Sequence, residues 1–154
     1  MITRQDVLDA LEKRMPFRIF ARDGRMFLVK GVGEIGVMQT YAKLTTSTRP
    51  RGEASNGADE VPYEQIDRLE SLNLPAPSVP IRPQDLDAAM HREPFVPFRV
   101  FSTDGRSFKV EGFGEIAIGK YYAWLTDEFN GEGDRIYYEK MARIEPMMMS
   151  TVTR

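Results

Sequence analysis

The amino-acid sequence predicts an α+β protein in which one small unit occurs twice. Each copy is expected to be an N-terminal helix followed by a small antiparallel barrel or strongly bent sheet. Residues 16–45 and 97–126 align without a gap and agree at 17 of 30 positions. In both copies an Asp-Gly pair separates two runs rich in aromatic and β-branched residues, and an amphipathic stretch precedes them. Such a repeat implies one fold for both halves.

The composition narrows the class of protein. The chain has 154 residues, of which 42% are hydrophobic and 29% charged, with a net charge of −2. This suits two units of about 75 residues each and excludes a global basic field for nucleic acid. The absence of cysteine excludes disulfides and thiolate chemistry. No run approaches the roughly 20 apolar residues of a membrane span. We therefore expect a cytoplasmic protein without membrane contact.

A short helix is expected at the start of each copy. Apolar residues recur there at helical spacing, namely Val7, Ala10 and Leu11 in the first copy and Leu86, Ala89 and Met90 in the second. Thr3 followed by Asp6 predicts an N-cap, and Pro83 suits a first helical turn. Pro16 and Pro97 then lead into extended segments, and the second copy carries two extra residues before this point.

The Asp-Gly pairs at 23–24 and 104–105 predict antiparallel hairpins. A two-residue turn with positive φ at both central residues is the usual form for this pair. That register places Phe20 opposite Phe27, and Phe101 opposite Phe108. Because both aromatic pairs recur, we expect them to face the core.

The remaining elements follow in the same order in each copy. Strands are expected at 33–37 and 40–45, and again at 114–118 and 121–126. Polar loops cover 47–60 and 127–135, and closing strands cover 61–70 and 136–145. The predicted organisation is a first unit at 1–72, a Pro-rich linker at 73–80, a second unit at 81–149 and a tail at 150–154.

A glycine motif in each copy admits two interpretations. Residues 31–36 satisfy the dinucleotide-binding fingerprint, and 112–117 satisfy its looser form. Phosphate binding needs a helix that begins at the glycines within a parallel crossover unit. The preceding strand instead belongs to a tight antiparallel hairpin, which favours kinks or bulges in a strand. We expect no cofactor.

Several charged residues recur, and they suggest either a duplicated polar site or ordinary ion pairs. Cross-strand ion pairs are the interpretation we favour for most of them. Glu34 and Glu115 stand between a glycine and an apolar strand, where a carboxylate is expected to need a partner. Arg18 and Arg99 are the candidate partners.

The second copy is richer in aromatic residues along its fourth strand. Tyr121, Tyr122 and Trp124, together with Arg99 and Arg106, form the candidate interaction surface if they converge. The alternative is that the aromatics belong to the barrel core or to the contact between the two units. His91 is the only histidine and has no repeated partner, so no metal site and no catalytic residue is predicted.

Two resemblances are visible in these motifs. Phe17-x-Ile19-x-x-x-Asp23-Gly24 followed by Gly31 resembles the first Sm motif, and residues 138–144 resemble the closing segment of the bacterial Sm-like RNA chaperone. Residues 94–100 with 104–106 resemble short bacterial proteins built on Pro-Phe-x-Pro-Phe-Arg-Ile/Val and Asp-Gly-Arg. The first resemblance implies a tandem duplication of an Sm-like or SH3-like barrel, and the second brings no activity with it.

These observations favour a non-enzymatic interaction or scaffold module. Its partner would be a protein, or a second copy bound through strand edges. The alternative is single-stranded nucleic-acid binding by a barrel face, which would have to overcome the acidic average. A third interpretation, a small enzyme with Glu34 and Glu115 as general bases, requires each carboxylate to lie in a concave pocket.

Overall fold

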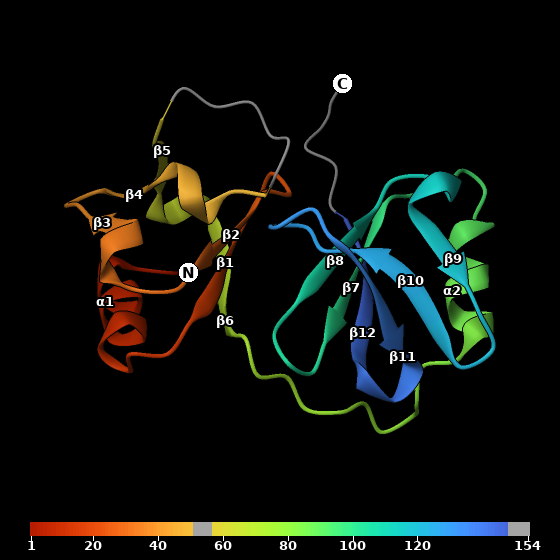
Figure 1. Ribbon diagram of the computed structural model, residues 1–154. Coiled ribbons are helices and arrows are strands. Elements are labelled where there is room, and N and C mark those ends of the chain that lie inside the picture. The colour runs from red at the N-terminus through yellow and green to blue at the C-terminus, as the bar shows by residue number, and fades with distance from the viewer. Residues whose placement is uncertain (51–56, 148–154) are drawn as a thin grey trace. The chain divides into compact units, whose positions relative to one another are not determined.

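The computed structural model describes residues 1–50 and 57–147. In that part of the chain, two α-helices and twelve strands form a mixed α+β structure, with the strands in four three-stranded antiparallel sheets (Figure 1). The chain divides into two compact units, Met1–Leu72 and Asn73–Met147. The expected linker at 73–80 contains no helix or strand. The expected tail at 150–154 and residues 51–56 of the first polar loop lie outside the described residues.

The two units share one order of elements. The first contains α1 (Arg4–Glu12), β1 (Phe17–Ala21), β2 (Met26–Val29), η1 (Val32–Glu34), β3 (Ile35–Val37), β4 (Tyr41–Leu44), β5 (Asp59–Pro62), η3 (Tyr63–Gln65) and β6 (Ile66–Ser71). The second contains α2 (Pro83–Met90), β7 (Phe98–Ser102), β8 (Ser107–Val110), η4 (Phe113–Glu115), β9 (Ile116–Ile118), β10 (Tyr122–Thr126), β11 (Gly133–Tyr137), η5 (Tyr138–Lys140) and β12 (Met141–Pro146). A further 3-10 turn, η2 (Thr46–Thr48), follows β4.

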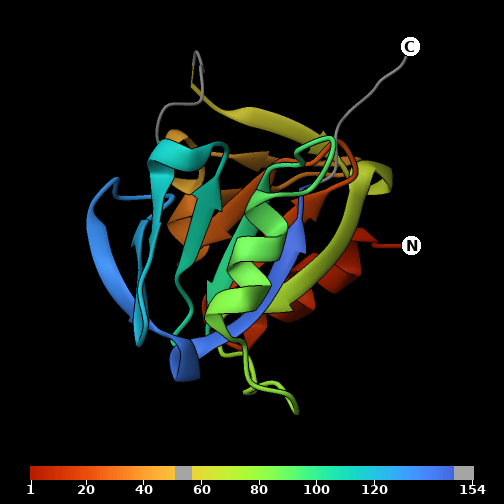
Figure 2. The same cartoon turned by 90° about the vertical axis from the view of Figure 1, so that its right-hand side faces the viewer.

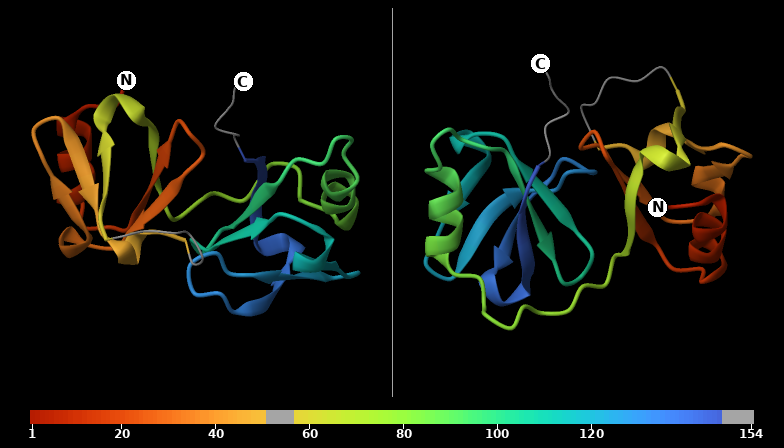
Figure 3. Two further views of the ribbon diagram at one scale, coloured as in Figure 1. Left: turned by 90° about the horizontal axis from the view of Figure 1, so that it is seen from above. Right: turned by 180° about the vertical axis from the view of Figure 1, so that it is seen from behind.

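Each unit is built from two sheets. Their strand orders are β2-β1-β6 and β3-β4-β5 in the first unit, and β12-β7-β8 and β11-β10-β9 in the second. In the second unit an isolated antiparallel bridge between Phe108 and Asp127 also joins β8 to the residue after β10. The ladders therefore give two three-stranded sheets in each unit, where the sequence predicted a small barrel or a strongly bent sheet. Figures 2 and 3 show each helix beside the strands of its own unit.

Both predicted helix starts are confirmed. The Thr3 hydroxyl accepts from the Asp6 amide, and the Asp6 carboxylate accepts from the Thr3 amide, so α1 begins in a complete capping box. Pro83 occupies the first turn of α2, where no amide donor is lost. The buried residues of the two helices are Val7, Leu86 and Met90, which belong to the predicted apolar stripes.

The hairpin register differs from the prediction by one residue. Ile19 lies opposite Phe27, and Phe20 lies opposite Met26; in the second unit Val100 lies opposite Phe108. The reason is the turn, which has three loop residues because the amide of Ala21 donates to the carbonyl of Arg25. Gly24 takes φ 96°, whereas Asp23 is not in the left-handed region. This is a glycine-bulge hairpin in place of the expected two-residue turn.

The register shift moves Phe20 and Phe101 to the other face of their strands. Both rings remain buried. The guanidinium carbon of Arg68 lies 3.9 Å from the centre of the Phe20 ring, and that of Arg143 lies 4.4 Å from the Phe101 ring. Both faces of β1 and β7 are therefore covered.

The glycine motifs form neither a nucleotide-binding helix nor a kinked strand. Residues after Gly31 and Gly112 make one 3-10 turn each, and the following strands begin only at Ile35 and Ile116. Those strands then enter antiparallel sheets. No parallel crossover that would present amide donors to a pyrophosphate is formed here.

The core of each unit uses the same positions. Phe17, Phe27, Leu44 and Tyr63 in the first core correspond to Phe98, Phe108, Leu125 and Tyr138 in the second. The tyrosine hydroxyls bond to matching places, since Tyr63 donates to the carbonyl of Met38 and Tyr138 to that of Gly119, each at 2.6 Å. The repeat in the sequence is thus also a repeat in packing.

Candidate interaction surface

Strand alternation in β10 separates core residues from an exposed aromatic row. Ala123 and Leu125 are fully buried, whereas the intervening Trp124 is 48% exposed. Across the ladder Tyr122 lies opposite Tyr137 of β11, and Trp124 lies opposite Arg135. Successive side chains of a strand point to opposite faces, so these four residues share the outer side of the sheet. We call Tyr122, Trp124, Arg135 and Tyr137 the aromatic face.

Close contacts hold the aromatic face together. The rings of Tyr122 and Tyr137 meet edge to face with their centres 5.6 Å apart. The guanidinium carbon of Arg135 lies 5.6 Å from the centre of the Tyr122 ring. Trp124 packs against Gly133, where an added Cβ would lie 2.9 Å from the indole nitrogen. The indole therefore depends on a glycine on the neighbouring strand.

The turn between β9 and β10 extends this surface. The amide of Gly119 donates to the carbonyl of Tyr122, which closes the turn between these two strands. Tyr121 is 66% exposed, and the amine of Lys120 lies 5.3 Å from the centre of its ring. The three aromatics predicted from the sequence thus belong to β10 and the turn that leads into it.

The matching sheet of the first unit has a different character. Tyr41 lies opposite Pro62, and Lys43 lies opposite Glu60. Lys43 takes the place of Trp124, and Glu60 that of Arg135. The aromatic face is therefore a property of the second unit, whereas the fold beneath it is shared.

Arg99 does not reach this surface. Its guanidinium bonds to the Glu128 carboxylate through Nε and Nη2 at 3.1–3.2 Å, and the two side chains are 5% and 1% exposed. Glu128 lies 29 residues away in the chain, and no pattern in the sequence pointed to it. A buried, bidentate ion pair is the role that the structure assigns to Arg99.

Arg106 lies between two carboxylates. Its Nη1 donates to Asp134 at 2.6 Å, and its Nε donates to Asp104 at 3.1 Å. Burial would raise the pKa of Asp104, but the Ser102 hydroxyl, the Arg106 amide and the Arg106 charge together hold it below its usual value. The Arg106 hydrogen bond likewise lowers the pKa of Asp134. Arg106 is thus engaged with anions of its own chain.

The repeated glutamates brace their own loops. The Glu34 carboxylate accepts from the amide of Lys30 at 2.8 Å, and the Glu115 carboxylate accepts from the amide of Glu111. Arg18 instead forms an ion pair with Glu70 at 3.9 Å. The expected pairing of Arg18 and Arg99 with these glutamates is therefore wrong, because each glutamate closes a turn four residues long.

Residues 135 and 137 were absent from the surface predicted by the sequence. The alternation within 133–137 contains the signal, but it acquires meaning only once β11 is known to pair with β10.

Among the described residues, no group of three or more His, Cys, Asp or Glu side chains could hold a metal ion. In the same part of the chain, the helices are all too short or too polar to cross a membrane. Comparison with protein-family models, with curated proteins and with solved structures finds no match to this chain.

Proposed function

We propose that the chain is a non-enzymatic protein-interaction module and that its second unit binds a protein partner through the aromatic face. The observation that carries this proposal is the exposure of Trp124, Tyr137 and Tyr121 on one sheet, next to Arg135. Tyr, Trp and Arg are the residues most enriched among energetic hot spots of protein interfaces. The first unit keeps the fold without these residues, so folding alone does not require them.

The edge of the same sheet offers a second element of recognition. β9 is the outer strand in the order β11-β10-β9, and Ala117 of β9 lies opposite Trp124. A partner strand added along β9 would extend the sheet that carries the indole, with main-chain hydrogen bonds supplying affinity and the aromatic face supplying specificity. A second copy of this chain is one such partner, and the test below distinguishes it.

Single-stranded nucleic acid is the alternative ligand. Half-buried Tyr122 and exposed Trp124 favour it, because bases stack on such rings. The charges weigh against it. Arg99 is buried against Glu128, and Arg106 is bonded to Asp104 and Asp134, so both arginines expected at this surface are engaged with carboxylates of the chain itself.

We also propose that each unit is a copy of one ancestral barrel of Sm-like or SH3-like type. The shared order of elements, the 3-10 turn before the last strand and the Phe108–Asp127 bridge support this. In this proposal, the second copy acquired the aromatic face after the duplication.

The experiment compares Trp124→Lys with Phe113→Lys. Lys is the residue that the first unit carries at the matching position, and Phe113 is an exposed aromatic (66%) of the same unit outside the aromatic face. Sedimentation of each purified chain first measures self-association. Immobilised chains then capture partners from the source cells, and each captured protein is purified and titrated against every variant.

We expect Trp124→Lys to weaken the purified complex at least 30-fold, as for a hot spot of about 2 kcal/mol, and Phe113→Lys to leave it unchanged. If the wild-type chain sediments as a dimer and the Trp124→Lys chain as a monomer, the partner is a second copy of the chain. Equal binding by all three chains would overturn the proposal. Binding of short RNA that weakens steeply with salt and depends on Trp124 would favour the alternative.

A further inference from the structure

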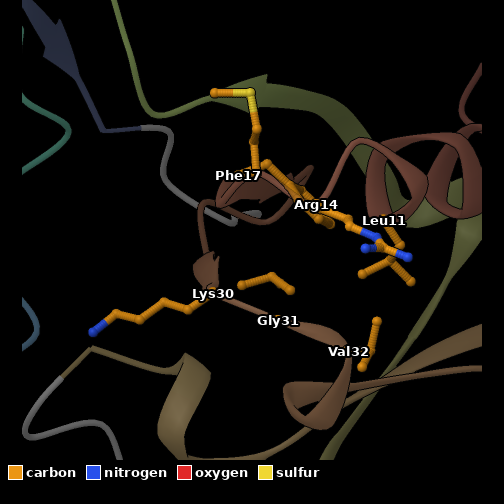
Figure 4. Close-up of a pocket in the computed structure, with 8 residues that line it drawn as sticks. Leu11, Arg14, Phe17, Lys30, Gly31 and Val32 are labelled. Carbon is orange, nitrogen blue, oxygen red and sulfur yellow. The ribbon is translucent and has the colours of Figure 1, made fainter.

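The first unit contains a pocket between the end of α1 and the segment that follows β2 (Figure 4). Its volume is about 390 Å³, within the range of small-molecule sites. Leu11, Phe17, Val29 and Val32 contribute apolar walls, and Arg14 and Lys30 are its two cations. In Figure 4 the Arg14 guanidinium lies beside Leu11, whereas the Lys30 amine points away from the other lining side chains.

The second unit fills the corresponding space with one of its own side chains. Phe98 and Phe113 take the places of Phe17 and Val32. Between them lies Phe95, whose ring centre is 6.4 Å from that of Phe98 and 6.5 Å from that of Phe113. Phe95 is one of the two extra residues of the second copy. The first unit therefore has an open pocket where its duplicate holds a phenyl ring.

The charge at this place is also reversed between the units. Arg14 and Lys30 correspond to Glu93 and Glu111. Two cations thus line the open pocket, and the second unit carries carboxylates at the matching sequence positions. An anionic group on a ligand would be attracted in the first unit and repelled in the second.

Arg14 is held in an unusual backbone conformation. Its φ is 57°, and its amide donates to the carbonyl of Leu11 at 3.0 Å. It is the one non-glycine with positive φ in residues 1–50 and 57–147. Glycine is the ordinary residue at such a helix end, and an L-residue there costs about 1–2 kcal/mol. Strain of this kind clusters at functional sites, which is consistent with a role for the guanidinium.

The opposite wall is braced before any ligand arrives. The Lys30 amide donates to the Glu34 carboxylate at 2.8 Å, and the Glu34 amide donates to the carbonyl of Gly31 at 3.1 Å. These bonds close the segment 30–34 on itself. A preformed wall lowers the entropic cost of binding.

We propose that this pocket binds a small molecule that joins a phenyl-sized apolar ring to a carboxylate. The ring lies between Phe17 and Val32, where the duplicate places Phe95. The carboxylate lies at Arg14, the cation beside the apolar wall. This site is separate from the aromatic face and stands whether or not the proposed protein interaction does.

The test is an NMR titration of the full chain with 3-phenylpropionate. Two control compounds separate the contributions: 3-phenylpropanamide keeps the ring but has no charge, and acetate keeps the carboxylate but has no ring. We expect saturable shifts confined to the amides around Phe17 and Gly31, with the acid binding about two- to fivefold more tightly than the amide and acetate causing none of them. Absence of saturable shifts there, or equal affinity for acid and amide, would overturn the proposal.

Two variants with matched controls locate the ligand. Arg14→Gln should remove the preference for acid over amide, whereas Arg92→Gln, at an exposed arginine of the second unit, should keep it. Val32→Asp should weaken binding about tenfold or more because a charge enters the apolar wall. Val79→Asp is its control, since Val79 is as exposed as Val32 (72% and 73%) but lies in the linker. A preserved preference in Arg14→Gln, or parental affinity in Val32→Asp, would contradict the assignment.

Discussion

The buried ion pair of Arg99 and Glu128 makes a sharp prediction about stability. Replacing Glu128 by Gln keeps the shape of the side chain but removes its charge. The Arg99 guanidinium then stays in a place where its side chain is 5% exposed, without the carboxylate that accepts three of its hydrogen bonds.

The size of the effect follows from the geometry. Two unit charges about 4 Å apart attract by about 4 kcal/mol at an effective dielectric constant near 20. Desolvation of both groups offsets much of this in the intact pair, whereas Glu128→Gln removes the attraction and leaves the Arg99 charge buried. Removing one partner of a buried pair costs about 3–5 kcal/mol. Since glutamine retains one acceptor oxygen, we expect about 3 kcal/mol for Glu128→Gln.

Urea unfolding at pH 7, followed by far-UV circular dichroism, measures this loss. The matched control is Glu111→Gln, which removes the same charge from a pair with Lys109 at 3.9 Å where the glutamate side chain is 52% exposed. Exposed pairs contribute about 0–1 kcal/mol, so the control should remain close to the parent. The double replacement Arg99→Met with Glu128→Leu should be less destabilised than Glu128→Gln, because no charge is left buried. Equal losses for Glu128→Gln and Glu111→Gln would refute the reasoning.

Two further predictions concern features that occur in both units. Gly105 has φ 97°, so Gly105→Ala should lower the free energy of unfolding by about 1–2 kcal/mol. The control is Gly112→Ala, which should not lower it, because Gly112 has an extended φ of −174° and open space around the added Cβ. A similar loss in both variants would contradict the turn assignment. Burial raises the pKa of the Tyr138 hydroxyl above 10.0, so its stabilisation is complete below pH 10 and declines as the pH rises further. Tyr138→Phe removes the hydrogen bond to Gly119 and should lower the free energy of unfolding by about 0.5–1.5 kcal/mol at pH 7. Thermal unfolding should show a smaller difference between variant and parent at pH 11. A difference that grows with pH would show that the fold does not hold the hydroxyl neutral.

Local features of the fold were predictable from the sequence. The cap at Thr3, the proline at the start of α2 and the reversal at each Asp-Gly pair depend on residues within one turn of one another. The register of the hairpins was not predictable in the same way. Asp-Gly fits both a two-residue turn and a three-residue loop with a glycine bulge, and one residue of difference exchanges the two faces of a strand.

The candidate surface was predictable in part. Tyr121, Tyr122 and Trp124 are adjacent in the chain, so their grouping needed only strand periodicity. Tyr137 and Arg135 join them across the β10–β11 ladder. The assignment of Arg99 to this surface failed, because its partner Glu128 comes from the segment after β10, and packing withdraws the guanidinium from water.

The chain alone determined that one module is present twice, and that each copy has a capped helix, reversals at its Asp-Gly pairs and matching apolar positions. These properties depend on residues close together in the chain, and each of them occurs in both copies. Only the tertiary structure decided which charges are buried, which aromatics share an outer face and which copy has an open pocket. Those outcomes depend on residues far apart in sequence, whose pairing is selected by the packing of whole sheets.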